Sequence, residues 1–225
     1  MPEWWTYSLS DFLLFSPRTY YRLIERHNLA LWPAHLLTLA LGAGIPALLR
    51  RPTPARARAA AAVLVSLWAW VGWSFVARRY ATINWAAAYA AWLFALEALL
   101  LGWWGMVRGR LRLGRWRDAR ALAGGGVFAL ALALYPLLAP GTGRAWGQAE
   151  TFGIAPDPTV LATAGILLGA EATPRWRWLL LAVPLVWCLL SGATLRAMGA
   201  PEAWIMLSAV LLAVAFALPR GRPAS

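Results

Sequence analysis

Seven long apolar segments, separated by short polar stretches, follow a more polar beginning of the chain. A membrane-spanning helix needs about 20 mostly apolar residues, with a range of about 17–25. Six segments satisfy this length within the error of their boundaries, and the fifth is shorter because Asp157 and Glu171 flank it. The pattern predicts an all-α fold, a polytopic transmembrane bundle of seven spans. The predicted spans are 29–49, 59–77, 85–107, 121–139, 158–173, 176–195 and 201–218.

The short fifth segment carries two local signals. Asp157 stands directly before Pro158, and we expect it to cap the start of this helix, because proline favours the first helical position. Gly165 and Gly169 are four residues apart. Small residues at this spacing let two membrane helices approach closely, so we expect this face to pack against another helix.

The polar beginning of the chain predicts an amphipathic helix. Ser16 followed by Pro17 is typical of a helix N-terminus. Apolar or aromatic residues recur at helical spacing on one face, and arginines occupy another. The two sets are Tyr20, Leu23, Ile24 and His27, and Arg18, Arg22 and Arg26. Such a helix is too polar to span and lies in the membrane interface. The predicted organisation is therefore an interfacial segment 1–28, a transmembrane domain 29–218 and a cytoplasmic tail 219–225.

Composition excludes several classes of protein. Only 13% of the 225 residues are charged and 61% are apolar, whereas soluble domains carry about 25% charged residues. The net charge of +12 does not indicate a nucleic-acid partner, since the basic residues lie between apolar segments. With Cys188 alone and two separated histidines, the sequence predicts neither a disulfide nor a metal site, and no cofactor.

The arginines predict the orientation of the bundle. If all seven segments span, 14 of the 21 arginines fall on the side that holds the loops after the first, third and fifth spans and the C-terminal tail. The positive-inside rule makes this side cytoplasmic. We therefore expect the N-terminus outside, the C-terminus inside, and anionic lipid at the basic cytoplasmic face.

Four blocks of the sequence are distinctive in more than hydrophobicity. They read WWTYSLSDFLLFSPRTYYRLIERHNLALWPA, RRYATINWAA, AETFGIAPDPT and LVWCLLSGATLRAMGAPEAW, and the resemblance they carry extends over most of the chain. These blocks resemble a family of bacterial integral membrane proteins, domain of unknown function 6064. The resemblance implies a multi-pass protein of the bacterial plasma (inner) membrane. It implies no catalytic or binding residue, because the function of that family is not known.

Two polar residues fall within the predicted spans. Glu97 lies near the middle of the third span, where a charged carboxylate is costly unless it is paired or protonated. We expect it to be protonated, to face the bundle interior and to hydrogen-bond there. Its functional interpretation is a proton or cation site, and the alternative is a purely structural hydrogen bond. His35, near the outer end of the first span, is a ligand-binding candidate or a satisfied interfacial histidine.

Further candidates lie at the outer side. Arg79, Asn84 and Trp85 occupy the turn between the second and third spans, where arginine and amide groups suit an anion or a lipid phosphate; headgroup anchoring is the alternative. The long loop 140–157 is suited to form a lid over an outward-facing pocket, and Arg196 is expected to join the same cluster.

Three functions remain open at this point. An acid within the membrane favours a small-solute transporter or channel with an outward-facing polar pocket. The scarcity of buried polar groups favours a non-catalytic accessory or scaffold subunit, or a binder of an apolar ligand, and protein partners would be a second copy or another membrane subunit. An enzyme is disfavoured and no catalytic residue is assigned, because the sequence offers no nucleophile–base pair, metal box or phosphate loop.

Overall fold

The computed structural model describes residues 13–50, 53–113 and 118–217, and within these ranges the chain is helical, with one isolated antiparallel bridge between Leu113 and Ala170. The predicted all-α class is confirmed. Residues 1–12 and the predicted tail 219–225 lie outside the described residues. The α-helices are α1 (Pro17–Leu31), α2 (Ala34–Arg50), α3 (Pro54–Val71), α4 (Ala87–Leu101), α5 (Ala119–Ala129), α6 (Leu138–Gly141), α7 (Pro156–Gly169), α8 (Pro174–Ala197) and α9 (Ala203–Ala217).

Three of these helices continue into shorter helical turns. π-helical turns Gly72–Ala77, Gly102–Val107 and Leu130–Leu134 extend α3, α4 and α5, and a 3-10 turn Tyr135–Leu137 leads from α5 into α6. Two further 3-10 turns, Tyr80–Thr82 and Trp146–Gln148, lie in loops. Each of the seven apolar segments therefore contains a helix.

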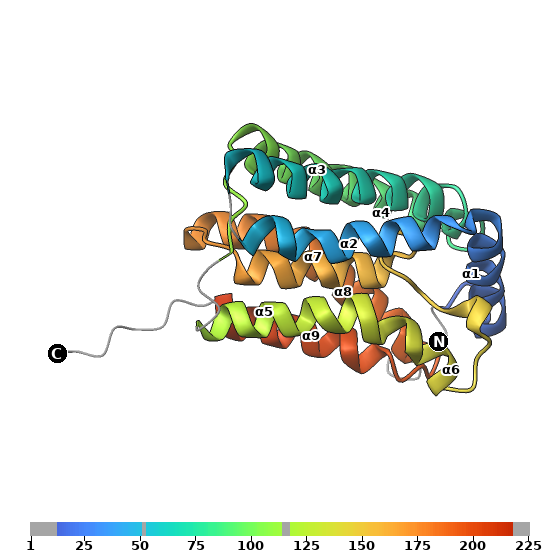
Figure 1. Cartoon of the computed structure of the whole chain (residues 1–225). Coiled ribbons are helices and arrows are strands. Elements are labelled where there is room, and N and C mark those ends of the chain that lie inside the picture. The colour runs from blue at the N-terminus through green and yellow to red at the C-terminus, as the bar shows by residue number, and fades with distance from the viewer. Residues whose placement is uncertain (1–12, 51–52, 114–117, 218–225) are drawn as a thin grey trace.

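The long helices form a bundle that α1 closes at one end. Figure 1 shows α2, α3, α4, α5, α7, α8 and α9 side by side along one direction, with α1 crossing their ends. The bend between α1 and α2 is 90°. The first predicted span began too early, because α1 runs to Leu31 and the corner at Trp32–Pro33 separates it from α2.

Four helical stretches are long and apolar enough to cross a membrane. They are Pro54–Thr82, Ala87–Val107, Ala119–Gly141 and Pro174–Ala197, and the bent pair α1–α2 is a fifth if it is counted as one span. α7 has 14 residues and α9 has 15, so both are shorter than these. The protein is thus a helical bundle with several apolar, membrane-compatible helices.

The centre of the bundle is α7. Every residue from 149 to 170 is buried, which includes the whole of α7 and the non-helical segment before it. α7 suits such a position because it has no continuous polar face to turn toward water, and its polar side chains Asp157, Thr159 and Thr163 are hydrogen-bonded within the fold. The second half of the 140–157 loop, which was predicted to form a lid, is therefore inserted into the bundle, and residues 141–148 are exposed or half-buried.

Close packing of two helices fixes α7 in place. A Cβ atom built on Gly165 would lie 2.5 Å from the Gly124 carbonyl oxygen of α5, and one built on Gly124 would lie 2.3 Å from the Gly165 oxygen. Only glycine permits this approach of two backbones. The predicted close packing at Gly165 is confirmed, and its partner is α5.

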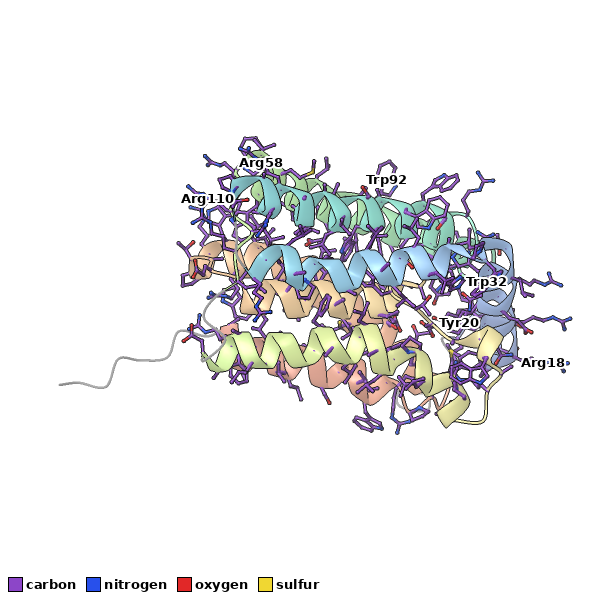
Figure 2. All side chains as sticks on the ribbon, viewed as in Figure 1. Arg18, Tyr20, Trp32, Arg58, Trp92 and Arg110 are labelled. Carbon is purple, nitrogen blue, oxygen red and sulfur yellow. The ribbon has the colours of Figure 1, made fainter. Side chains whose placement is uncertain are left out.

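The start of α1 is as predicted. Ser16 is the N-cap, its side chain accepts a hydrogen bond from the Thr19 N–H, and Pro17 follows. Tyr20, Ile24 and His27 are buried against the bundle, whereas the arginines of α1 are exposed. In Figure 2 Arg18 extends away from the bundle at this end.

Candidate functional site

The six residues predicted to bind a ligand do not form one site. The Arg79 guanidinium donates a hydrogen bond to the carbonyl oxygen of Ser74, five residues earlier in the chain, at 3.0 Å. Trp85 is exposed and contacts Tyr89 edge to face. The Arg196 guanidinium lies over the Trp204 ring at 5.8 Å. His35 and Glu97 are buried in different helices.

Asn84 is the predicted residue that lines a small cavity at the end of the bundle that α1 crosses, mostly apolar but with several polar groups in its wall. Its Nδ2 donates to the Tyr80 hydroxyl at 3.2 Å, and its Oδ1 accepts from the Ala86 N–H at 3.1 Å. The cavity has a volume of about 110 Å³. Its other polar lining residues are Tyr20, Tyr80, Trp187, Ser191 and Thr194.

Asp157 lies behind the wall of this cavity and organises it. The carboxylate is fully buried. Its Oδ2 accepts hydrogen bonds from the Ser191 hydroxyl at 2.7 Å and the Tyr135 hydroxyl at 3.2 Å, and its Oδ1 accepts from Trp187 Nε1 at 2.8 Å. A carboxylate offers about four acceptor positions, so Oδ1 retains capacity for a further donor. No cation is paired with Asp157 among the described residues.

This geometry corrects the predicted capping role of Asp157. The N-cap of α7 is Ala155, and no side chain caps the helix. The helix starts at Pro156, one position before Asp157, so the Asp157 side chain points toward its neighbours on α8 and on the turn after α5. Asp157 is therefore the centre of a site, contacted from two other elements.

Two more acids and an arginine lie in the same region. Glu202 forms an ion pair with Arg144, whose guanidinium also lies over the Tyr21 ring at 4.2 Å. Glu150 is buried, and within the described residues its Oε2 has no hydrogen-bond partner. Burial, together with the nearby Asp157, raises the pKa of Glu150 well above its usual range. Arg144 thus connects the loop before α7 to α1 and to the turn that leads into α9.

α1 is held over the site by side chains near its C-terminal end. Asn28 Nδ2 donates to the carbonyl oxygens of Gly147 and Ala149, each at 2.8 Å. The Asn28 Oδ1 lies 3.2 Å from His35 Nε2, so His35 positions Asn28 and does not face the cavity. His27 Nε2 lies 3.1 Å from the Ile154 carbonyl oxygen. These contacts fix the buried segment that leads into α7.

Tyr20 lines the cavity on the side that α1 covers. It is buried, and its ring packs against Tyr80 at 5.8 Å. Burial, and then the charges of Glu150 and Asp157, raise the pKa of Tyr20 well above its usual range. Tyr20 therefore keeps its proton, and the site holds a neutral phenol next to carboxyl groups.

The buried His27 predicts a pH-dependent stability. Burial, and then the charge of Arg79, lower the pKa of His27 from 6.5 to about 4. The folded state thus binds fewer protons than the unfolded state between these values, so the stabilisation is present above pH 6.5 and is lost as the pH falls to 4. Because the unfolded state takes up this proton first, we expect the free energy of unfolding to fall by about 3 kcal/mol between pH 6.5 and pH 4.

The measurement is the unfolding of the purified protein and of His27→Gln between pH 7 and pH 4. Glutamine retains a donor for the Ile154 carbonyl and does not titrate, so the variant reports the loss due to all other groups. The wild type should lose more stability than His27→Gln. Parallel curves for the two proteins would show that His27 is not the titrating group.

Comparison with known proteins identifies the family. The family of unknown function DUF6064 matches residues 18–225. The chain belongs to this family. The match confirms the resemblance inferred from the four sequence blocks and covers every residue of the Asp157 site. No curated protein and no solved structure matches the chain.

Glu97 occupies a different environment in this DUF6064 chain. It is fully buried in α4, as expected, but neither carboxyl oxygen has a hydrogen-bond partner among the described residues. The prediction of a hydroxyl, amide or carbonyl partner was wrong, because apolar and aromatic side chains fill the surrounding core. Phe94, one turn before Glu97, packs against Trp187 at 4.9 Å and Trp68 at 4.7 Å.

Sequence reasoning missed the centre of the DUF6064 site. Ser191 of α8 donates a hydrogen bond to Asp157, whereas Thr194, three residues later, donates to the Leu190 carbonyl. The available signal was an acid beside a short apolar helix. Across the parts of the chain that the structure describes, no group of three or more His, Cys, Asp or Glu side chains is arranged to hold a metal ion.

Proposed function

We propose that the protein is a membrane transporter for a small monovalent cation, with an outward-facing binding site at the cavity in front of Asp157. The observation that carries this proposal is a fully buried carboxylate with three neutral donors and no paired cation among the described residues. A buried acid of this kind inside a membrane protein marks an ion or proton pathway. A cation in the cavity would balance its charge.

The free groups of the cavity suit the same ligand. Ser191 donates its proton to Asp157 and Thr194 donates its proton to the Leu190 carbonyl. The Ser191 oxygen therefore keeps lone pairs for a ligand in the cavity, and the Thr194 oxygen also interacts with the Tyr80 hydroxyl. Such acceptors bind a metal cation or an ammonium group, and Asp157 increases the negative potential of Ser191.

The size of the cavity limits the ligand. A volume of about 110 Å³ holds three or four non-hydrogen atoms, at about 30 Å³ for each water-sized group. A partly hydrated sodium ion or a small primary amine such as methylammonium has this size. A sugar or an amino acid does not fit without movement of the lining residues.

A second carboxyl group lies further along the bundle. Trp187 contacts Asp157 on one side and Phe94 on the other, and Glu97 is one turn from Phe94 on α4. In our proposal Glu97 is the next group that exchanges a proton or a cation. In this proposal the predicted site residues Asn84 and Glu97 belong to one cation path, and His35 positions Asn28 on α1, the helix that covers the path.

The proposal includes a topology of seven spans with α1 in the outer interface. Figure 2 supports it, since Arg58 and Arg110 lie at the end of the bundle opposite to α1. We place that arginine-rich end in the cytoplasm of a bacterium, with the N-terminus outside and the C-terminus inside, in the plasma membrane. The cavity then opens toward the outer side.

The experiment is uptake of radiolabelled methylammonium by liposomes that contain the full-length protein, in competition with sodium. Asp157→Asn and Ser191→Ala should lower the initial rate about ten- to hundredfold, since a hydrogen bond to a charged group contributes about 1.5–3 kcal/mol. Glu25→Gln is the matched control, because it neutralises a half-buried carboxylate of α1 that accepts a hydrogen bond from Gln148 Nε2 and does not line the cavity.

A titration of tryptophan fluorescence with sodium tests cation binding without requiring transport. Trp187 bonds Asp157, so cation binding should change the emission of the wild type and leave Trp187→Phe unchanged. Equal uptake by all folded variants, with no sodium-dependent emission change, would overturn the transport proposal. Co-purification of a stoichiometric membrane subunit would then favour the accessory role.

A further inference from the structure

An apolar groove runs along the side of the bundle between α2 and α5. It has a volume of about 530 Å³, and α7 forms its floor. Figure 1 shows α2 and α5 along the same face of the bundle. The lining includes Ile45 and Leu49 of α2, Gly126 and Leu132 from α5 and its extension, and Ile166 of α7.

A glycine cluster in α5 creates this groove. Gly124 is in contact with α7, whereas a Cβ atom built on Gly126 would meet nothing within 4 Å. The lining runs from Ala121 to Ala133, which corresponds to about 18 Å at 1.5 Å per residue. One leaflet of the hydrocarbon core is about 15 Å deep, so the groove has the length of one leaflet.

The groove leads into a polar pocket at the arginine-rich end. This pocket has a volume of about 370 Å³ and shares Ala121 and Gly169 with the groove. Its charged lining residues are Asp118, Arg120, Glu171 and Arg177. The apolar groove and the charged pocket therefore adjoin each other at the start of α5.

Arg177 is the most buried charged residue of the pocket. Its side chain is 6% exposed, and its Nη2 donates to the carbonyl oxygens of Ala170 and Ala172. Its Nε has no hydrogen-bond partner within the described parts of the chain. A buried guanidinium donor without a partner is suited to an anionic oxygen such as that of a phosphate.

We propose that this groove binds a phospholipid with an ammonium-bearing headgroup, such as phosphatidylethanolamine. An acyl chain lies in the apolar groove, the phosphate lies at Arg120 and Arg177, and the ammonium group lies at Asp118 and Glu171. The pocket carries both signs of charge, so a zwitterionic headgroup satisfies it. A purely anionic headgroup would place its added negative charge next to the two acids.

This site is separate from the Asp157 cavity. It lies on the α2–α5 side, toward the arginine-rich end, while the cavity lies under α1 at the outer end. The bound lipid would fill the space between α2 and α5 and support the Gly124–Gly165 contact. The inference therefore does not depend on what the protein transports.

The experiment is native mass spectrometry of the full-length protein released from nanodiscs that contain equal amounts of phosphatidylethanolamine and phosphatidylglycerol. We expect the wild type to retain phosphatidylethanolamine several-fold more than phosphatidylglycerol. Gly126→Leu fills the groove and should remove the retained lipid. The matched control is Gly44→Leu on α2, since Gly44 also has open space around its Cβ position and does not line the groove.

A second variant tests the headgroup. Asp118→Asn combined with Glu171→Gln should abolish the preference for phosphatidylethanolamine while a phospholipid is still retained. Equal retention by Gly126→Leu and Gly44→Leu would overturn the groove as the site. Preferential retention of phosphatidylglycerol by the wild type would overturn the assigned headgroup, and co-purification of a second copy or a peptide in the groove would overturn the lipid itself.

Discussion

Replacement of Gly124 by alanine is expected to lower the free energy of unfolding by about 3 kcal/mol, whereas the same change at Gly126 is expected to be neutral or to raise it by up to about 1 kcal/mol. At Gly124 the added Cβ lies 2.3 Å from the Gly165 oxygen and 2.9 Å from the Gly169 nitrogen. These are backbone atoms, so a side-chain rotation cannot relieve the clash. At Gly126 the Cβ has open space, and alanine gains its helix propensity.

The two variants are compared by thermal unfolding of the purified protein in one detergent, with the amount of monodisperse protein as a second measurement. Gly124→Ala should unfold at a lower temperature than the wild type, and Gly126→Ala should not. Similar behaviour of both variants would contradict the assigned contact between α5 and α7. Because both positions are in α5 and two residues apart, the comparison controls for detergent and for expression.

Removal of the Arg144 side chain is expected to cost about 3–5 kcal/mol, because Glu202 would remain buried without its partner. Glu202 is 3% exposed and pairs with Arg144, which also covers the Tyr21 ring. The double variant Arg144→Met, Glu202→Met removes both charges and should recover most of the stability lost in Arg144→Met, since replacing a buried ion pair by apolar side chains is often close to neutral.

A double-mutant cycle of Arg144→Met and Glu202→Met measures this coupling. The chemical unfolding of the four proteins gives the interaction energy directly. If Arg144→Met alone loses less than about 1 kcal/mol, the pair has the weak energy of exposed ion pairs. The connection of the outer loop to α9 would then rest on other contacts.

The helices were predictable because their signals are local. Each apolar run contains a helix, and the N-cap at Ser16 follows from two adjacent residues. The close helix contact at Gly165 was also predictable, because it follows from the four-residue spacing of Gly165 and Gly169. The seven spans follow from such runs only if α2, α7 and α9, which have 17, 14 and 15 residues, also cross the membrane.

The Asp157 site was not predictable from periodicity. Its donors Tyr135, Trp187 and Ser191 are separated from Asp157 by 22, 30 and 34 residues. No helical spacing relates them, and only the packing of α7 between its neighbours brings them together. Glu97 shows the converse, because its burial was evident from the sequence while its lack of a described hydrogen-bond partner depends on tertiary packing.

The continuous burial of residues 149–170 constrains how this chain is assembled during synthesis. A segment that the insertion machinery releases into the bilayer on its own must expose its side chains to lipid, and α7 has no side that faces outward in the finished fold. Its 14 residues and the carboxyl group of Asp157 also make lone insertion costly. If α7 crosses the membrane as proposed, we expect α5 to shelter it until α8 brings Trp187 and Ser191, so that α5, α7 and α8 insert as a cooperative unit.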